Sequence, residues 1–203
     1  NLRYRIESIG LFLVYGIKSY WLKGAYSQHG QDECLREIFH IEKKLRCIIE
    51  VGANRPSLNS NSKLFDSSLK IISIDPIDYS LDYSMERPEV KFLNYAIGKE
   101  EREAEFYEVI DHDGWQNQMS SFNRPDERFE YKLKTVNVRR LSSIITENRK
   151  YIDGEYLLML DVEGWELNVL ESLGANLELY PRYILIECIA FDFQLIKYLK
   201  KMG

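Results

Sequence analysis

Four short runs of the sequence are apolar almost without interruption, and polar or helix-like segments separate them. The runs are RCIIEV (46–51), KIISID (70–75), YLLMLDV (156–162) and YILIECI (183–189). Strands that are apolar on both faces are typical of a parallel sheet covered by helices on both sides. The pattern therefore predicts an α/β fold with a mostly parallel sheet, in which ligands bind beyond the carboxyl ends of the strands.

Weaker signals complete the predicted order of elements. Further strands are expected at VKFLNYAI (90–97), EAEFYEV (103–109) and KTVNVRRL (134–141). Helical spacing of apolar residues, or capping patterns, predict helices over residues 27–45, 60–69, 79–87, 142–149, 164–173 and 191–202. Because the chain shows no internal repeat and no convincing linker, we expect one domain over residues 26–203 after a helical extension over residues 1–25.

Composition narrows the class of protein. The 203 residues are enough for one sizeable α/β domain, and the formal net charge of -5 argues against a nucleic-acid-binding surface. The three cysteines, Cys34, Cys47 and Cys188, form no CxxC pair and have no histidine at zinc-ligand spacing. They are interpreted as reduced, buried thiols, which favours a cytoplasmic location.

The N-terminal segment is apolar but short. Residues 9–17, IGLFLVYGI, are far fewer than the roughly 20 that a membrane-spanning helix needs, and they lack a signal-peptide cleavage pattern. We expect a helix packed on the domain, with peripheral membrane contact as the alternative. The chain begins at Asn1 and stops at Gly203, so we expect a trimmed chain.

Acidic residues follow the apolar runs. They are Glu50, Asp75, Asp161 with Glu163, and Glu187. One acid at a strand end is more often a helix cap or a turn than a site. Acids from several strands of one sheet edge repel each other unless a cation or a ligand with several donors lies among them. The sequence therefore predicts a ligand site at this edge.

The spacing at the first two strands is that of an adenine-nucleoside site. Gly52 follows the first strand, and Asp75 ends the next strand 23 residues later. The glycine is expected to remove a Cβ so that a ligand can lie against the backbone. Asp75 is expected to accept hydrogen bonds from the ribose hydroxyls, and Pro76 and Ile77 to form an apolar wall for the adenine.

The loop after Gly52 separates two classes of nucleoside. A dinucleotide needs a second and third glycine so that its pyrophosphate meets a helix N-terminus, but GANRPSL (52–58) has a proline instead. S-adenosylmethionine has no phosphate, and such a loop can meet its ammonium and carboxylate groups. A nicotinamide-dependent oxidoreductase is therefore the weaker interpretation.

Several blocks, in order, resemble the FkbM-type S-adenosylmethionine-dependent methyltransferases. They cover most of the chain from residue 26 to residue 187. The blocks are YSQHGQDECL (26–35), EVGANRPSLNSNSKLF (50–65), IISIDP (71–76), RPEVKFLNYAIG (87–98), MSSF (119–122) and LDVEGWELNVLESL (160–173). In MSSF, Ser120 and Ser121 stand where Asn-Thr is common in the family, which leaves a substrate contact there in doubt.

The resemblance implies a Rossmann-like class I methyltransferase fold with a mostly parallel seven-stranded sheet, whose final strand pair would be missing here. It implies methyl transfer from S-adenosyl-L-methionine, usually to a hydroxyl of a sugar, glycan or natural product. The residues that it places around the cofactor are Gln28 on the N-terminal side, Glu50, Gly52, Ala53 and Asn54 at the methionine part, Asp75 at the ribose, and Asn94 and Ala96 at the adenine.

Asp161 and Glu163 are the first candidates for the catalytic base. Residues i and i+2 after a strand leave on the same side, so one can remove a proton while the other orients the acceptor. His29, beside Gln28 and Gln31, is the rival base. The two carboxylates also suit Mg²⁺, but the resemblance does not require a metal and none is expected.

One different class of function stays open. A methyltransferase fold that has lost activity would serve as a binding or scaffolding module. Four aromatic residues are expected either as a platform for a sugar ring or as core, namely Trp115, Phe122, Tyr131 and Trp165. The expected partner is a small-molecule or glycan acceptor; the sequence indicates neither its identity nor the oligomeric state.

Overall fold

The computed structural model describes residues 35–36, 44–56, 58, 60–66, 68–110, 112–113, 115–187 and 192–202. The predicted extension over residues 1–25 lies outside this range, as do Gln28, His29, Cys34 and Cys188. Of the helix predicted over residues 27–45, only Leu35 and Arg36 are described in helical conformation, and Leu35 is fully buried.

The larger sheet has five strands, all parallel, in the order β3-β2-β1-β7-β8. The strands are β1 (Leu45–Val51), β2 (Lys70–Ile74), β3 (Lys91–Leu93), β7 (Glu155–Leu160) and β8 (Tyr183–Ile186). The predicted parallel α/β architecture is confirmed, but the expected number of seven strands is wrong for the described chain. The strands that lie between β3 and β7 in the chain form a separate sheet.

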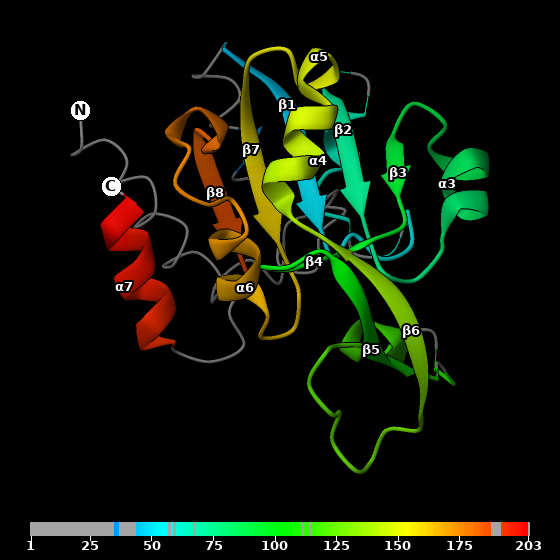
Figure 1. Cartoon of the computed structure of the whole chain (residues 1–203). Helices are drawn as coiled ribbons and strands as arrows, with labels where there is room; N and C mark the ends of the chain where they lie inside the picture. The colour runs from blue at the N-terminus through cyan, green and yellow to red at the C-terminus, as the bar shows by residue number, and fades with distance from the viewer. Residues whose placement is uncertain are drawn as a thin grey trace.

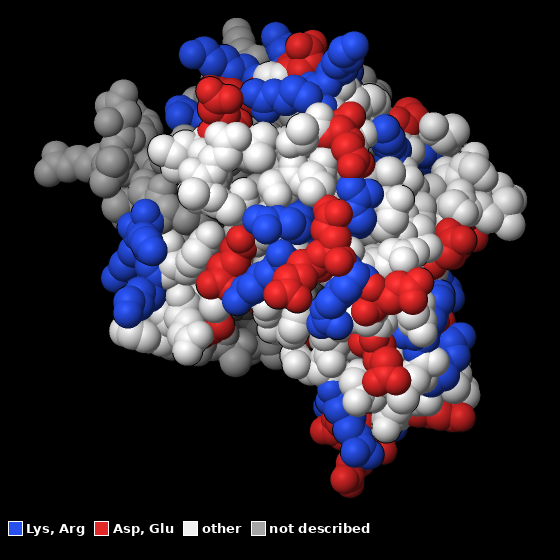
Figure 2. Space-filling model, in the orientation of Figure 1, with Lys and Arg blue, Asp and Glu red and all other residues white. Residues whose placement is uncertain are grey.

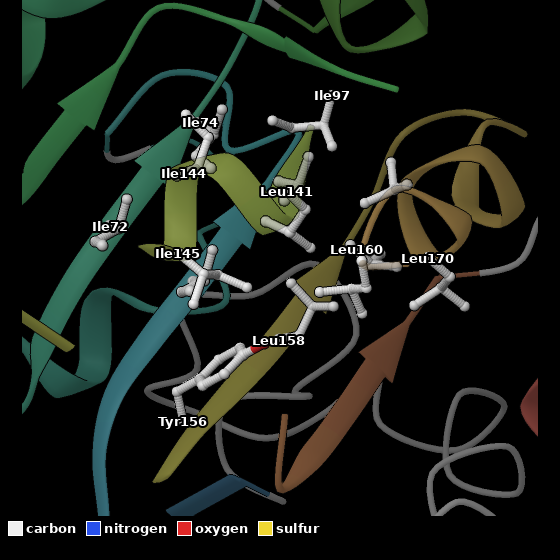
Figure 3. Close-up of a cluster of buried hydrophobic side chains, with 14 of the residues drawn as sticks. Ile72, Ile74, Ile97, Leu141, Ile144, Ile145, Tyr156, Leu158, Leu160 and Leu170 are labelled. Atoms are coloured by element: carbon white, nitrogen blue, oxygen red, sulfur yellow. The ribbon is translucent and has the colours of Figure 1, made fainter. Parts of the chain in front are cut away.

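Alternate residues of the strands enter two separate cores. Ile49 of β1 and Leu158 of β7 pack with the helices α4 (Leu141–Glu147), α5 (Arg149–Ile152), α6 (Glu166–Glu171) and α7 (Phe193–Met202). Figure 3 shows side chains of β2 and β7 facing those of α4 in this core. Ile48 and Leu157 point to the other face, where 3₁₀ helix η1 (Lys63–Phe65) and α3 (Ser80–Glu86) contribute. This alternation explains the unbroken apolar runs, because both faces are covered.

A second sheet of three strands projects beyond the carboxyl ends of β1, β2 and β7 (Figure 1). It has the order β4-β6-β5, with β4 (Ala96–Ile97), β5 (Arg102–Val109) and β6 (Tyr131–Arg139). The run predicted as one strand over residues 90–97 is split between the sheets, because β3 pairs with β2 and β4 pairs with β6. Strands β5 and β6 form an antiparallel pair whose inner face packs as a third small core.

Two further 3₁₀ helices complete the described structure, η2 (Gln116–Met119) and η3 (Leu177–Leu179). The segment predicted as a helix over residues 60–69 forms only the short η1. Among the residues that the structure describes, no helix has the length and apolar character that crossing a membrane requires.

Candidate active site

A cavity of about 310 Å³ lies at the carboxyl ends of the parallel strands. Its lining comes from the ends of β1, β2, β3, β7 and β8 and the segments that follow them, from β4 and β5 of the smaller sheet, and from η2. In the strand order, the chain reverses direction across the sheet between β1 and β7, which is where ligands bind in open α/β folds. The volume is within the usual range for small-molecule sites.

All five predicted strand-end acids line this one cavity: Glu50, Asp75, Asp161, Glu163 and Glu187. The cofactor candidates Gly52, Ala53, Asn54, Pro76, Ile77 and Ala96 line it as well. Among the described lining residues there is no Lys, Arg or His. The described lining is therefore rich in carboxyl groups and contains no basic side chain.

Glu50 is buried and is held by hydroxyl groups. Its carboxylate accepts hydrogen bonds from Ser62 Oγ at 2.6 Å and from Ser73 Oγ at 3.4 Å. Burial raises the pKa of Glu50, while these hydroxyls and the positive charge of Arg87 oppose the rise. Arg87, itself buried, donates to Ser62 Oγ and pairs with Asp66, so it fixes the loop that supports Glu50.

Asp75 is only 6% exposed, and the protein orients both of its oxygens. The backbone N–H groups of Asn54 and Ile77 each donate to one carboxylate oxygen at 2.8 Å. Burial raises the pKa of Asp75 to about 6, and these two hydrogen bonds limit the rise. Because a carboxylate accepts about four hydrogen bonds, each oxygen keeps capacity for a ligand hydroxyl. Asn94 is not part of the cavity lining; its Nδ2 donates to the backbone oxygen of Asp75 at 3.0 Å.

A close contact with another segment of backbone requires glycine at position 52. Its φ is +79°, and a Cβ built on it would lie 1.7 Å from the carbonyl oxygen of Asp161. Asp161 N–H in turn donates to the carbonyl oxygen of Val51 at 3.1 Å. The missing Cβ therefore makes room for the backbone after β7. Gly52 also lines the cavity, and its contact with a ligand stays a prediction.

Asp161 and Glu163 lie in a strained turn after β7, and both line the cavity as predicted. Glu163 has a φ of +51°, a left-handed conformation that is uncommon for a residue with a side chain and is often found at functional sites. Ser121 Oγ donates to its carbonyl oxygen at 3.2 Å, which ties the turn to the smaller sheet.

The carboxyl groups of this turn are electrostatically unfavourable when ionised. Burial, Glu187 and Glu166 raise the pKa of Glu163 to about 7. Burial, and then the charges of Glu187 and Glu163, raise the pKa of Asp161 well above its usual value. Glu163 Oε2 is buried and has no hydrogen-bond partner in the described part of the chain. Such a group is available to take a proton near neutral pH.

Asn117 is a lining residue that the sequence does not reveal. It belongs to η2, and its side chain is 6% exposed. Its Nδ2 donates to Tyr79 Oη at 2.7 Å and to Asn54 Oδ1 at 3.2 Å, whereas its Oδ1 is buried without a partner within the described residues. No motif surrounds this residue, and only the folding of the smaller sheet against the larger one brings it to the cavity.

Aromatic residues form part of the wall. The rings of Phe122 and Trp165 lie 4.9 Å apart, and Phe106 meets Phe122 edge-on at 5.3 Å. Trp165 Nε1 is buried and has no hydrogen-bond partner among the residues described. Of the other two aromatic candidates, Trp115 is 47% exposed and packs on Phe129, and Tyr131 packs on Tyr107; neither lines the cavity.

Ser120 and Ser121 line the cavity, but their hydroxyls serve the protein. Ser120 Oγ donates to the carbonyl oxygen of Asn117 and accepts from the N–H of Val109. Ser121 Oγ donates to the carbonyl oxygen of Glu163 and accepts from the N–H of Asn123. Within the described ranges, no three His, Cys, Asp or Glu residues are grouped so that they could hold a metal ion.

Comparison with known proteins gives one match. Residues 50–203 match the family model described as the Methyltransferase FkbM domain. No curated protein and no solved structure matches the chain. The matched region contains the five strand-end acids, the loop after β1 and the smaller sheet. It also covers most of the sequence, which confirms the resemblance seen in the motifs: the chain belongs to the FkbM methyltransferase family.

Proposed function

We propose that this methyltransferase uses S-adenosyl-L-methionine to methylate a hydroxyl group of a sugar, glycan or natural-product acceptor. The observation that carries the proposal is the acid-lined cavity at the reversal point of the sheet. It combines five carboxylates with no Lys, Arg or His among its described lining residues. A cationic nucleoside suits this environment, whereas a pyrophosphate would be repelled by it.

The residues present fit the cofactor in three respects. Asp75 is oriented by Asn54 and Ile77 and keeps acceptor capacity for a ribose diol. The unpartnered oxygens of Asn61 and Asn117, both in the lining, are ready to accept hydrogen bonds from ligand donors. Glu50 adds a carboxyl group near the loop 52–54, where the ammonium and sulfonium groups of the cofactor would lie.

S-adenosylmethionine, when bound, supplies a methyl group already activated on a positively charged sulfur. The protein therefore contributes alignment and removal of a proton. We assign Glu163 as the base that would accept the proton of the acceptor hydroxyl when the methyl group passes from sulfur to oxygen and S-adenosylhomocysteine leaves, and Asp161 as the residue that would orient this hydroxyl. A positioned base contributes about 10²–10⁴-fold in such steps. His29, outside the described residues, stays the rival base.

Calorimetric titration with S-adenosylhomocysteine tests the cofactor assignment, with NAD as the control ligand. We expect S-adenosylhomocysteine to bind and NAD not to bind. Tritium transfer from methyl-labelled S-adenosylmethionine to a panel of glycans then tests the reaction. Binding of neither nucleoside would support a scaffolding module instead, and binding of NAD alone would support an oxidoreductase.

A further inference from the structure

Arg87 is a buried cation that the proposed mechanism does not use. It follows α3 directly and lies outside the cavity lining. On the outer face in Figure 2, Lys and Arg side chains lie among Asp and Glu at the surface. The side chain of Arg87, by contrast, is only 1% exposed. A guanidinium group stays charged and is costly to bury, so its place inside the protein requires several polar partners.

The polar partners of the Arg87 side chain all belong to the segment between β1 and β2. Its Nη1 donates to the carbonyl oxygen of Pro56 at 3.2 Å and to Ser60 Oγ at 2.9 Å. Its Nη2 donates to Ser62 Oγ at 3.0 Å. Its Nε donates to the two carboxylate oxygens of Asp66 at 3.0 and 2.9 Å. One guanidinium group therefore holds this segment at four points.

Ser62 connects Arg87 to Glu50, which lines the cavity. Ser62 is fully buried, and its Oγ donates to Glu50 Oε2 at 2.6 Å. Because Arg87 donates to the same Oγ, the single hydrogen of Ser62 is directed toward Glu50. The arrangement needs only an acceptor at Oε2, so it holds for an ionised Glu50 and for one protonated on Oε1. The hydroxyl of Ser73 also reaches Oε2, but at the longer distance of 3.4 Å.

The segment between β1 and β2 also contributes to the cavity directly. Leu58 and Asn61 belong to it, and both are lining residues. Asn61 is the chain neighbour of Ser62, whose hydroxyl Arg87 holds. A displacement of this segment would therefore move Leu58 and Asn61 together with the hydrogen-bond donor of Glu50. All three lining residues lie on the side of the cavity that the proposed function assigns to the cofactor.

We propose that Arg87 is a positioning residue for cofactor binding, an inference that rests on the proposed function. It acts through Ser62 on Glu50, and through its other contacts on the segment between β1 and β2. The affinity for the nucleoside therefore depends on a side chain that lies outside the cavity. The geometry that carries this inference is the continuous path of hydrogen bonds from the Arg87 guanidinium to the Glu50 carboxyl group.

Ser62→Ala is the most informative variant, because it removes the bridging hydroxyl and leaves Arg87 paired with Asp66. Glu50 then loses its shortest hydrogen bond and its fixed orientation. We expect the affinity for S-adenosylhomocysteine, measured by calorimetry, to fall about three- to ten-fold.

Ser172→Ala is the matched control. Ser172 is also fully buried, and its Oγ accepts from the N–H of Leu141 at 3.0 Å and donates to the carbonyl oxygen of Val169 at 2.6 Å. It is not part of the cavity lining. We expect both variants to lose stability in urea denaturation, but only Ser62→Ala to lose affinity. Unchanged affinity in Ser62→Ala, or an equal loss of affinity in both variants, overturns the inference.

Arg87→Gln tests whether the effect passes through Ser62. In the wild-type background this substitution removes several contacts at once, and we expect the affinity for S-adenosylhomocysteine to fall about ten-fold or more. In the Ser62→Ala background its effect should be at least about three-fold smaller, because the path to Glu50 is already broken. Equal losses in the two backgrounds would contradict coupling through Ser62. If Arg87→Gln does not fold, the comparison of Ser62→Ala with Ser172→Ala decides the question alone.

The two proposals fail in different ways. If S-adenosylhomocysteine does not bind to the wild-type protein, the proposed cofactor and the role of Arg87 in binding it are both wrong. If it binds to the wild-type protein and equally well to Ser62→Ala, the cofactor assignment stands and the positioning role is wrong.

Discussion

The two sides of the cavity hold their carboxylates in opposite ways. On the β1–β2 side, Glu50 and Asp75 accept hydrogen bonds from hydroxyls and backbone N–H groups, so the protein fixes their positions. On the β7–β8 side, the neighbouring acids raise the pKa values of Asp161 and Glu163. Glu163 has a left-handed backbone conformation, and its Oε2 has no hydrogen-bond partner among the described residues. The first arrangement is preorganised for binding. In the second, the carboxyl groups are held in an unfavourable environment and can take a proton from a substrate.

The largest expected effect separates chemistry from binding. Glu163→Gln removes the proposed base while keeping the size of the side chain, so kcat should fall about 10²–10⁴-fold with the affinity for S-adenosylhomocysteine nearly unchanged. Single-turnover methyl transfer and calorimetry measure the two quantities. Glu178→Gln, on the exposed η3, is the control. Activity retained in Glu163→Gln would move the base to Asp161 or His29.

Gly52, where the two sides of the cavity meet, should tolerate substitution least. Gly52→Ala places a Cβ against the carbonyl oxygen of Asp161 and also imposes a side chain on a left-handed residue, so unfolding free energy should fall by at least about 3 kcal/mol. Gly164→Ala is the matched control: it also has a positive φ, but the nearest atom is 3.4 Å away, and we expect about 1–2 kcal/mol. Urea denaturation compares them, and equal losses would contradict the role of the backbone contact.

A substitution on the β1–β2 side should change the affinity for the nucleoside. Asp75→Asn turns one acceptor oxygen into a donor, which then faces the N–H of Asn54 or of Ile77. Affinity for S-adenosylhomocysteine should fall about ten- to a hundred-fold, because a buried N–H loses its partner and the diol loses an acceptor. Asp78→Asn, three residues further in an exposed position, is the control. Full affinity in Asp75→Asn would remove Asp75 from the nucleoside site.

The smallest effect concerns pH. A carboxyl group with a pKa raised by folding binds more protons in the folded state, so its contribution to stability falls as pH rises from its ordinary value through about 7. Glu163 is partly solvated, so wild type should lose about 1–2 kcal/mol relative to Glu163→Gln between about pH 5 and pH 8. Activity should show the opposite trend, because the base must be ionised. Denaturation of both proteins across this range measures the difference, and parallel curves would argue against a raised pKa.

Much of the site can be predicted from the sequence because its position follows from the pattern of strands alone. In a parallel sheet all carboxyl ends reach one edge, so acids after apolar runs, such as Asp75 and Asp161, meet without further information. The features that the sequence does not reveal depend on contacts between distant segments. The carbonyl oxygen of Asp161 explains why position 52 requires glycine. Asn117 reaches the cavity only because the smaller sheet folds against the larger one. The run over residues 90–97 is divided between two sheets for the same reason, since β3 pairs with β2 whereas β4 pairs with β6.

The backbone of Gly52 lies directly against the backbone of Asp161, and this contact fixes the distance between the two halves of the cavity. Side-chain replacement cannot lengthen or shorten it, because no side chain lies between them. Acceptor specificity is therefore best redesigned in η2 and in the segment that follows it, which supply Asn117 and Phe122. The main chain fixes the spacing of the two halves, whereas the segments beside the projecting sheet can be changed to alter the chemistry of the cavity.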